Sequence, residues 1–358
     1  MGKRFFYLFL GTGILLLGCA GQKPDSTDTG GKSTDEEINI SRLSKTLSDD
    51  ILYANDLAIG EGAVGMQSFD ILANGDILAC GIANGALWFQ RMGKSGVCEL
   101  PMKIWFAGHG TNMSVEEDGG EVYLWTSNYA SHIDEGSDYY VEKLISRVKY
   151  SPGAELLPED CDDNYYVGPY KNMLVSTDSE NDLLCVICED DGKSGYDTKA
   201  RIWTMSEAKK APVRDVSLGE VNRGGDPGCP VKVRETIYPV VSARDLTKLR
   251  PLFEFSINGK ALDGDDPMQG FCVYGNDFYW FAGDGGKRSA MVSVVGFDGE
   301  VKNLKVGLAV GNRKEDVVSL GSESGYFEPE GIKIRNGEVF AGFLWGHKNN
   351  HRLTIINL

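Results

Sequence analysis

Short runs of apolar residues, broken by tight polar turns, recur along most of the chain. The runs are rich in β-branched and aromatic residues and are separated by Gly-Asp, Asn-Gly and Gly-Gly pairs, a pattern typical of strands joined by hairpin turns. Four segments align as an apolar strand, a polar turn and a second apolar strand, and a fifth follows the same template less closely. The four cover residues 66–81, 114–127, 268–283 and 329–343, and the fifth covers residues 174–190.

Most copies continue into a further apolar run, which several of them open with a basic residue. These runs are residues 86–92, 143–150, 201–205, 288–297 and 352–358. A recurring antiparallel unit that cannot bury both of its faces alone is typical of a β-propeller blade. The sequence therefore predicts an all-β fold, a β-propeller with five blades. Six blades are the alternative, because the wide gap before residue 268 has room for a degenerate blade around residues 210–260.

The repeated strands from the first copy to the C-terminus are predicted to form one domain. The Pro-, Arg- and Gly-rich stretch near residues 205–250 is interpreted as an insertion between blades, so that residues 39–358 form a single propeller. The last strand, which ends at Leu358, is expected to close the ring against early strands near residues 51–59. Closure of the ring removes exposed strand edges, which would otherwise pair with other chains.

The first residues are predicted to be a targeting segment. Lys3 and Arg4 precede an apolar run of residues 5–17, which ends in Leu16-Leu17-Gly18-Cys19. The run is too short for a permanent membrane helix, and its end resembles a bacterial lipobox. This resemblance implies a signal peptide of residues 1–18 and a lipid on Cys19 that attaches the chain to a membrane. Residues 19–38 are too polar to fold and are predicted to be a flexible, acidic tether. The expected location is the bacterial envelope, facing the periplasm or the cell exterior.

Composition says little more about the fold, but the net charge restricts the kinds of partner that the protein can bind. The chain has 45 glycines in 358 residues, against an average usage of about 7%, and the repeated turns account for the excess. The net charge of −16 argues against a nucleic-acid partner, because phosphate binding needs a concentrated basic surface. The oligomeric state is not encoded in any visible pattern, and we expect a monomer.

The cysteines are interpreted as structural. Cys185 and Cys188 have the spacing of a metal or redox pair, but they lie in one continuous apolar strand. Residues three apart on a strand face opposite sides, so both are expected to be buried small hydrophobes. Cys161 and Cys229 lie in turn-like contexts and are a candidate disulfide for an oxidising compartment.

Several repeat starts resemble a known group of propellers. The matching residues are Gly108-His109-Gly110-Thr111-Asn112 with Tyr123-Leu124-Trp125-Thr126, Met66-Gln67-Ser68-Phe69, Met268-Gln269-Gly270-Phe271 and Pro329-Glu330-Gly331-Ile332. They resemble the group that contains helveticin J-type class III bacteriocins and teichoic acid biosynthesis protein C. The resemblance implies a five-bladed propeller at a bacterial envelope, and it implies no catalytic residues. The chain departs from the Gram-positive members through its lipobox and its acidic body.

The same repeat starts supply the candidate binding residues. The first strand of each propeller blade lines the central channel, and ligand sites lie at its mouth. Polar side chains at the repeat starts are therefore expected to converge on one axis and to hydrogen-bond hydroxyl-rich or cationic groups. The alternative is that they satisfy one another and hold the blades together. The residues are Gln67, His109, Asn112, Gln269 and Glu330.

Two functions remain open from the sequence. The first is a binding module for a glycan, another envelope polymer or a protein partner. The second is a glycan-directed hydrolase or lyase at the channel mouth, in which His109 acts with a carboxylate such as Glu330 or Glu116. No G-x-S-x-G or H-E-x-x-H motif is present, so the binding module is preferred. No cofactor is expected. Calcium at the acidic turns of residues 160–163 and 263–266 is a weaker alternative, because neither turn has EF-hand spacing.

Overall fold

The computed structural model describes the chain from residue 38 onward, with several gaps. The described residues are 38–40, 51–56, 65–93, 98–132, 140–161, 163–190, 197–225, 228–322, 324–347 and 350–358. The predicted signal peptide, Cys19 and all but the last residue of the tether lie outside them. None of the helices in this described part has the length and apolarity needed to cross a bilayer.

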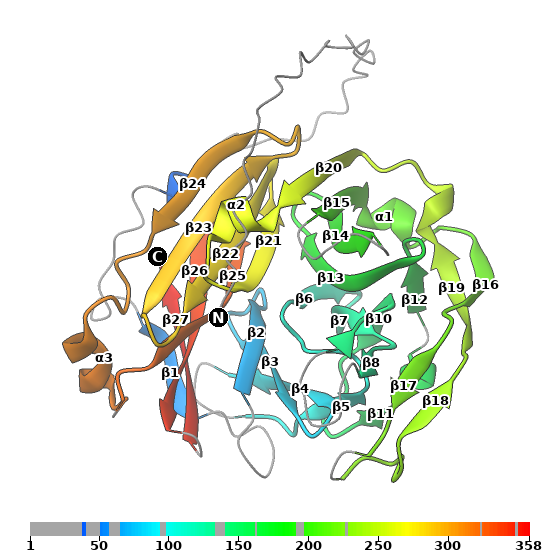
Figure 1. The fold of residues 1–358 in the computed structure, drawn as a ribbon, viewed down its shortest axis with the longest axis horizontal. Coiled ribbons are helices and arrows are strands. Elements are labelled where there is room, and N and C mark those ends of the chain that lie inside the picture. The colour runs from blue at the N-terminus through cyan, green and yellow to red at the C-terminus, as the bar shows by residue number, and fades with distance from the viewer. Residues whose placement is uncertain are drawn as a thin grey trace, which may run out of the picture. The chain divides into compact units, whose positions relative to one another are not determined.

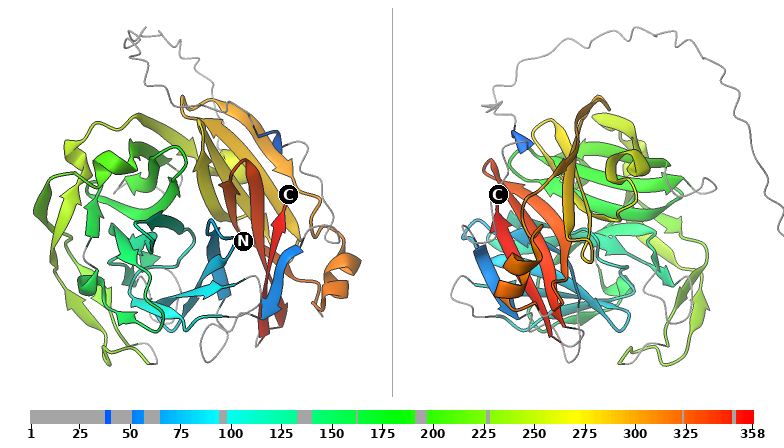
Figure 2. Two further views of the ribbon diagram at one scale, coloured as in Figure 1. Left: turned by 180° about the vertical axis from the view of Figure 1, so that it is seen from behind. Right: turned by 60° about the vertical axis from the view of Figure 1, so that its left-hand side comes forward.

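The chain folds as a five-bladed β-propeller, as the repeats predict. The blades stand around a common axis (Figure 1), and Figure 2 shows them from behind and from the side. The four strands of each blade pair antiparallel, and the inner strand faces the axis. The inner strands are β2 (Gly65–Ile71), β6 (Ser114–Asp118), β13 (Tyr170–Asp178), β21 (Met268–Tyr274) and β25 (Phe327–Arg335).

The second and third strands follow the inner strand in sequence order, because short turns join neighbours. The second strands are β3 (Ile77–Ala83), β7 (Glu121–Asn128), β14 (Leu183–Asp190), β22 (Asp277–Asp284) and β26 (Glu338–His347). The third strands are β4 (Ala86–Met92), β10 (Leu144–Lys149), β15 (Asp197–Thr204), β23 (Ser289–Gly296) and β27 (Asn350–Asn357). These strands match the predicted repeats closely.

The fourth strands complete the blades and close the ring. They are β5 (Met102–Trp105), β12 (Asp163–Tyr166), β20 (Phe253–Asn258), β24 (Val301–Gly307) and, in the last blade, β1 (Ile51–Asp56). The strand β1 pairs antiparallel with the C-terminal strand β27 from Ile51 opposite Ile356 to Asp56 opposite Arg352. The two ends of the propeller thus share one sheet, as expected for a closed ring.

The stretch that had room for a sixth blade is used differently. It lies between β15 and β20 of the third blade, yet β19 (Val240–Asp245) pairs in parallel with β12 of the second blade, and β16 (Val213–Ser217) pairs with β19. The six-blade alternative is therefore wrong, because the insertion extends the second sheet outward. Its remaining strands form a hairpin of β17 (Val221–Arg223) and β18 (Glu235–Ile237).

Short elements fill the spaces between blades. Two more short strands pair as β8 (Ser131–His132) and β9 (Tyr140–Val141), and β11 (Glu155–Leu156) joins the first sheet. The helices are α1 (Met205–Ala208), α2 (Gly259–Asp263) and α3 (Lys314–Leu320), with 3-10 turns at Pro158–Asp160 and Leu246–Lys248.

The core lies between neighbouring sheets, and the cysteines are part of it. Cys185 and Cys188 point into two different hydrophobic clusters on opposite faces of β14, which confirms the prediction for this pair. Cys161 and Cys229 also belong to different clusters and are not joined by a disulfide. The proposed pairing is therefore wrong, because Cys161 packs beneath the first two blades while Cys229 packs against Trp105 and Phe106.

Candidate functional site

Irregular backbone at the start of the inner strands defines one mouth of the channel. The pairing register shifts between Met66 and Ser68, between Met268 and Gly270, and between Pro329 and Ile332. A residue in such a bulge is left out of the ladder, and its side chain is re-aimed. Gln67, Gln269 and Glu330 occupy these three bulges, and a fourth lies between Lys171 and Leu174. In the first, fourth and fifth blades, the start of the repeat thus turns a polar side chain toward the mouth.

The glycines of the Gln-Gly-Phe and Glu-Gly-Ile motifs close the channel beneath these side chains. Gly270 and Gly331 have φ of 137° and 126°, a region that disfavours any other residue. A Cβ on Gly270 would lie 3.2 Å from the Cα of Gly331 and 3.3 Å from the Oδ1 of Asn112. The strand starts therefore approach one another across the axis and form a floor.

A cavity of about 690 Å³ opens above this floor, within the ~300–1,000 Å³ typical of small-molecule sites. Four of the five predicted residues line it, namely Gln67, His109, Gln269 and Glu330. The lining also holds four further carboxyl side chains and no Lys or Arg among the described residues. The additional carboxyls belong to Glu142, Glu189, Asp263 and Glu328. We call this cavity the mouth pocket.

Asn112, the fifth predicted residue, is not part of the mouth pocket. Its side chain is buried, donates to the carbonyl of Val175 at 2.6 Å and accepts from the N–H of Phe271 at 3.2 Å. It thereby ties the second blade to the third and fourth. For Asn112 the alternative interpretation, a polar side chain that holds blades together, is the one the contacts favour.

Glu142 and His109 meet at one wall of the pocket. The N–H of His109 donates to Oε1 of Glu142 at 3.1 Å, and Glu142 is only 4% exposed. Burial raises the pKa of Glu142 to about 7, although the hydrogen bond from His109 opposes the shift. A carboxyl group that titrates near neutrality is a proton donor and acceptor in the range where general acids and bases work.

Glu328, Glu330 and Gln269 form the opposite wall. Gln269 donates to Oε1 of Glu328 at 3.2 Å, and the hydroxyl of Tyr326 donates to Oε2 of Glu328. Glu330 is 3% exposed, and its pKa is raised well above the usual range by burial and by the negative charge of Glu328. Both carboxyls line the mouth pocket, and the bulge between Pro329 and Ile332 turns Glu330 toward it beside Glu328.

Asp263, at the end of α2, is the third carboxyl of the mouth pocket with a raised pKa. Burial raises the pKa of Asp263 to about 6, while the nearby positive charge of Lys305 opposes the shift. Trp280 lines the same part of the pocket and packs against Gly259, where a Cβ would lie 3.3 Å from the indole ring. Of the described tryptophans only Trp280 reaches the pocket, and five of the six are buried. Trp105, Trp125, Trp203 and Trp345 pack in the hydrophobic core instead.

The opposite half of the channel is filled by paired charges. Asp70 is fully buried and accepts from Arg335 at 2.5 and 3.1 Å and from the N–H of Val115 at 2.8 Å. Lys333 is buried beside it and donates to the carbonyl of Met113 at 2.5 Å. These bonds join the first, second and fifth blades, so this half is a structural tie. A smaller cavity of about 400 Å³ lies at that end, between the hairpin turns.

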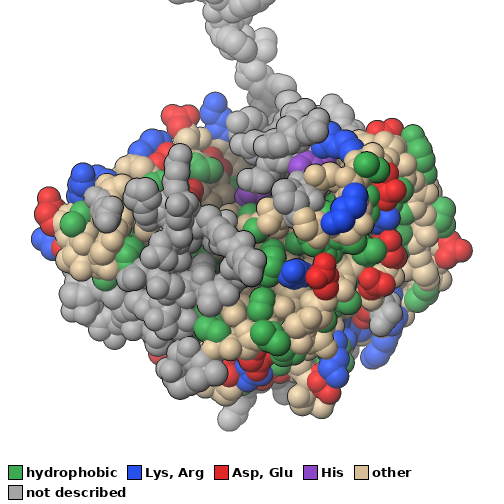
Figure 3. Space-filling view, turned by 90° about the horizontal axis from the view of Figure 1, so that it is seen from below, with side chains coloured by type: hydrophobic (Ala, Val, Ile, Leu, Met, Phe, Trp, Pro, Cys, Tyr) green, Lys and Arg blue, Asp and Glu red, His purple; other side chains and the backbone are tan. Residues whose placement is uncertain are grey.

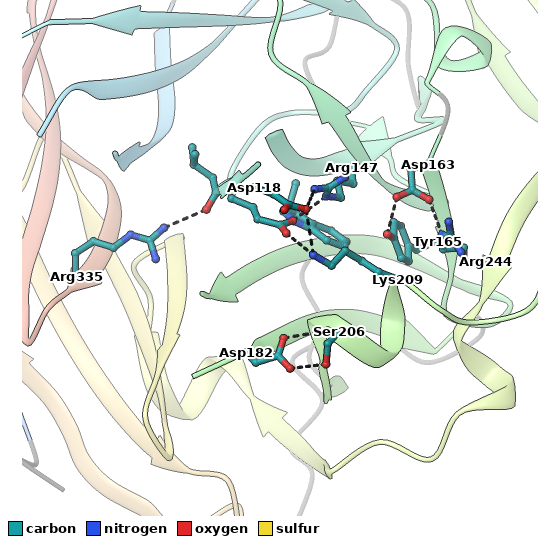
Figure 4. A network of polar contacts seen from close by, with 12 residues as sticks. Asp118, Arg147, Asp163, Tyr165, Asp182, Ser206, Lys209, Arg244 and Arg335 are labelled. Atoms are coloured by element: carbon teal, nitrogen blue, oxygen red, sulfur yellow. Dashed lines mark hydrogen bonds and ion pairs between the residues drawn. The ribbon is translucent and has the colours of Figure 1, made fainter. Parts of the chain in front are cut away.

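Glu116, considered above as a partner of His109, belongs to another network. Its carboxylate accepts from Lys209 at 2.6 Å, from Arg147 at 2.7 Å and from Trp125 at 2.9 Å. Burial disfavours the charged form, but these donors outweigh it and lower the pKa of Glu116. Figure 4 shows Arg147 and Lys209 converging at this point. The network anchors α1 to the second blade, and Glu116 has no part in the mouth pocket.

Charge elsewhere is dispersed. On the face seen in Figure 3, Lys and Arg lie among Asp and Glu without gathering into one stripe. The described residues contain no cluster of three or more His, Cys, Asp or Glu side chains placed to hold a metal ion. The calcium alternative therefore gains no support from the described side chains at the two acidic turns.

Comparison with known proteins agrees with the fold. The family described as phage 5-bladed beta propeller receptor binding platform domain matches residues 221–338, about a third of the chain. This segment contains Gln269, Asp263, Glu328 and Glu330. No curated protein matches the chain.

Similar solved structures are distant. They include a putative oxidoreductase (glucose dehydrogenase) from Thermus thermophilus, with 12% identity and a TM-score of 0.38 over 85% of this chain and 100% of that one. A GH43_1 enzyme from Xanthomonas citri has 8% identity and a TM-score of 0.40 over 89% and 92%. The propeller domain of the Trilobed protease from Pyrococcus furiosus has 11% identity and a TM-score of 0.31 over 82% and 95%. Superpositions this loose say nothing about the chemistry of the chain.

Proposed function

We propose that this protein is a lipid-anchored binding module of the bacterial envelope, whose mouth pocket takes a hydroxyl-rich segment of a cell-envelope glycan. The observation that carries the proposal is the pocket itself: about 690 Å³ of space lined by amide and carboxyl side chains from bulges that recur in several blades. Carboxylates accept and amides both donate and accept hydrogen bonds, which is the chemistry that sugar hydroxyls require.

Three further observations support this role. The segment of residues 221–338 resembles a phage receptor-binding propeller, and the repeat starts resemble the helveticin J and teichoic acid protein group, whose setting is the cell envelope. The lipobox-like Leu-Gly-Cys at residues 17–19 makes Cys19 the membrane anchor in this proposal. The chain would then face the periplasm or the cell exterior, as a monomer on a short tether.

The test is binding of the full chain to an array of bacterial envelope polysaccharides. For the glycan that binds, Gln269→Ala and Gln67→Ala are expected to weaken binding about five-fold each, since one lost hydrogen bond contributes roughly 1 kcal/mol. Their free energy of unfolding should fall by less than about 1 kcal/mol, because both side chains lie in bulges outside the strand ladder. Gln90→Ala is the matched control, since Gln90 is buried and donates to the carbonyl of Glu99 at 2.8 Å outside the pocket.

The outcome that would contradict the proposal is an equal loss of stability and binding in the two pocket variants. Gln67 and Gln269 would then hold the blades together, as Asn112 does. An array on which the wild-type chain binds no glycan would also refute the proposal.

A glycan-directed hydrolase or lyase is the second candidate, and one observation favours it. The pKa of Glu142 is about 7 while other carboxyls share the same pocket, and acid–base pairs in enzymes arise where environments push two pKa values apart. Release of reducing sugar from the bound glycan by the wild-type chain, abolished in Glu142→Gln, would make this the function instead.

A further inference from the structure

Buried carboxyl groups outside the mouth pocket have a cation or hydrogen-bond donors as partners. Four have a cation within hydrogen-bond distance: Asp70 with Arg335 at 2.5 Å, Glu116 with Lys209 at 2.6 Å, Asp245 with Arg214 at 2.5 Å and Asp277 with Lys302 at 2.8 Å. Asp178 has no such cation among the residues that the structure describes, but it accepts hydrogen bonds from Gly275 and Asn181. Burial of an unpaired charge is costly, and these pairings show how the fold avoids that cost.

The two deeply buried carboxyls of the mouth pocket break this rule. No described residue donates a hydrogen bond to the Glu330 side chain, and its nearest charged neighbour, Glu328, has the same sign. Glu142 receives only backbone N–H groups, that of His109 among them, and its charged neighbour is Glu189, again of the same sign. Both side chains line the cavity. The cation or side-chain donor that the rest of the fold supplies from within is missing at both positions among the described residues.

The charged groups around the pocket do not supply a cation for Glu330 or Glu142. The titratable groups that line it are His109, Tyr140 and the five carboxyls, and the positive charge of Lys305 acts on Asp263. Lys287 is taken by Asp266 at the surface. An incoming group with a positive charge would therefore find two carboxyls whose hydrogen-bonding capacity is largely unused.

The size and spread of the site favour an organic cation over a metal ion. The described residues hold no three-residue cluster with metal-binding placement, whereas the carboxyls are distributed around about 690 Å³ of space. An ammonium group carried on a sugar ring can reach one wall while the ring hydroxyls meet the amides of Gln67 and Gln269. A compact ion cannot satisfy carboxyls on opposite walls at once.

We propose that the ligand of the mouth pocket is an amine-bearing saccharide, with one ammonium group that pairs with Glu330 on one wall and a second that pairs with Glu142 on the other. The proposal rests on the proposed function and names the class of glycan that the pocket selects. Where a carboxyl carries a proton, that proton leaves to solvent as the ammonium group arrives, so that a neutral acid becomes a carboxylate paired with a cation. Affinity therefore depends on pH in a way that a neutral sugar would not show.

The test compares matched sugars by calorimetry on the full chain at neutral pH and low salt. Dimers of glucosamine and of galactosamine are each paired with their N-acetylated forms, which keep the ring and lose the charge. We expect at least one aminated dimer to bind about ten-fold or more tightly than its N-acetylated partner, an effect that weakens as salt is added. A lysine-rich peptide serves as a cation without a sugar.

Glu330→Gln separates charge from shape. Glutamine has the size of glutamic acid and cannot ionise, so the preference for the aminated dimer should fall about ten-fold while binding of the N-acetylated dimer is retained. Glu121→Gln removes one charge from an exposed turn, where Glu121 pairs with Lys149 at 2.9 Å, and should leave the preference unchanged. A trimethylammonium derivative, charged at every pH, should bind about ten-fold more tightly near pH 8 than near pH 5.5, because Glu142, whose pKa is about 7, ionises over that range.

The results of these tests separate failure of the amine selectivity from failure of glycan binding itself. Equal affinity for aminated and N-acetylated dimers refutes the amine selectivity and leaves glycan binding intact. Binding of an array polysaccharide but of none of the aminated dimers does the same. Binding of the lysine-rich peptide with no saccharide bound in any format refutes both the amine-sugar proposal and the proposed function. An unchanged preference in Glu330→Gln refutes the assignment of the ammonium group to Glu330.

Discussion

Replacement of Asp70 by alanine is expected to lower the free energy of unfolding by about 3–5 kcal/mol, the cost of breaking a buried ion pair. Asp70 is the carboxylate that faces Arg335 and lies beside Lys333, and it also accepts the N–H of Val115. Without it two cations remain in the channel with no anion between them. The expected result is a propeller that unfolds at much lower denaturant, measured by chemical denaturation of the full chain.

A matched pair of controls makes this prediction specific. Glu121→Ala also removes one partner of an ion pair, but that pair is about half exposed, and exposed pairs contribute roughly 0–1 kcal/mol. The double variant Asp70→Leu with Arg335→Met removes both charges and should recover part of the lost stability. A loss below about 1 kcal/mol for Asp70→Ala would mean that the channel tie is not structural.

The stability of the protein is expected to decrease as pH rises from about 5 to about 8, and Glu142→Gln should remove much of that decrease. The pKa of Glu142 is about 7 in the folded protein, raised from 4.5 by burial. The folded state therefore keeps a proton that the unfolded state loses, and stability falls with pH between these two values. One such proton corresponds to about 1.4 kcal/mol per pH unit, or about 3 kcal/mol across the window.

Denaturation at several pH values checks this prediction. Glutamine at position 142 keeps the oxygen that accepts the His109 N–H, so Glu142→Gln removes titration with little change in packing. The variant should show a shallower slope between about pH 5 and pH 7. The raised pKa of Glu330 adds to the wild-type slope in the same direction. An identical slope in wild type and Glu142→Gln would show that Glu142 does not retain its proton on folding.

The sequence predicts the blades well because each blade is a local pattern. An apolar strand, a polar turn and a second strand are contiguous, so hydrophobic periodicity suffices to find them. The insertion could not be predicted in this way. The strand β19 pairs with β12 although Arg244 and Tyr165 lie far apart in the chain, and nothing local at residues 240–245 specifies that partner. The proposed sixth blade arose from the same limitation.

The mouth pocket was predictable only where the repeat itself marks it. Gln67, Gln269 and Glu330 precede a small residue in a recurring motif, which is the sequence trace of the bulge. Glu328 has no such mark, because the bulge between Pro329 and Ile332 interrupts the strand alternation that would relate it to Glu330. Glu142, Glu189 and Asp263 have no shared motif. They come from three different kinds of segment, which only closure of the ring brings together.

The division of the channel is the central claim: glycan binds at the mouth pocket, and the opposite half is a structural tie. Hydrogen exchange of the full chain, with and without the polysaccharide that binds on the array, tests it most directly. The claim predicts slower exchange in residues 108–111, 267–271 and 328–332, and unchanged exchange in the opposite turns, residues 72–76, 179–182 and 335–338. Protection of the opposite turns, with none at the mouth pocket, would contradict it.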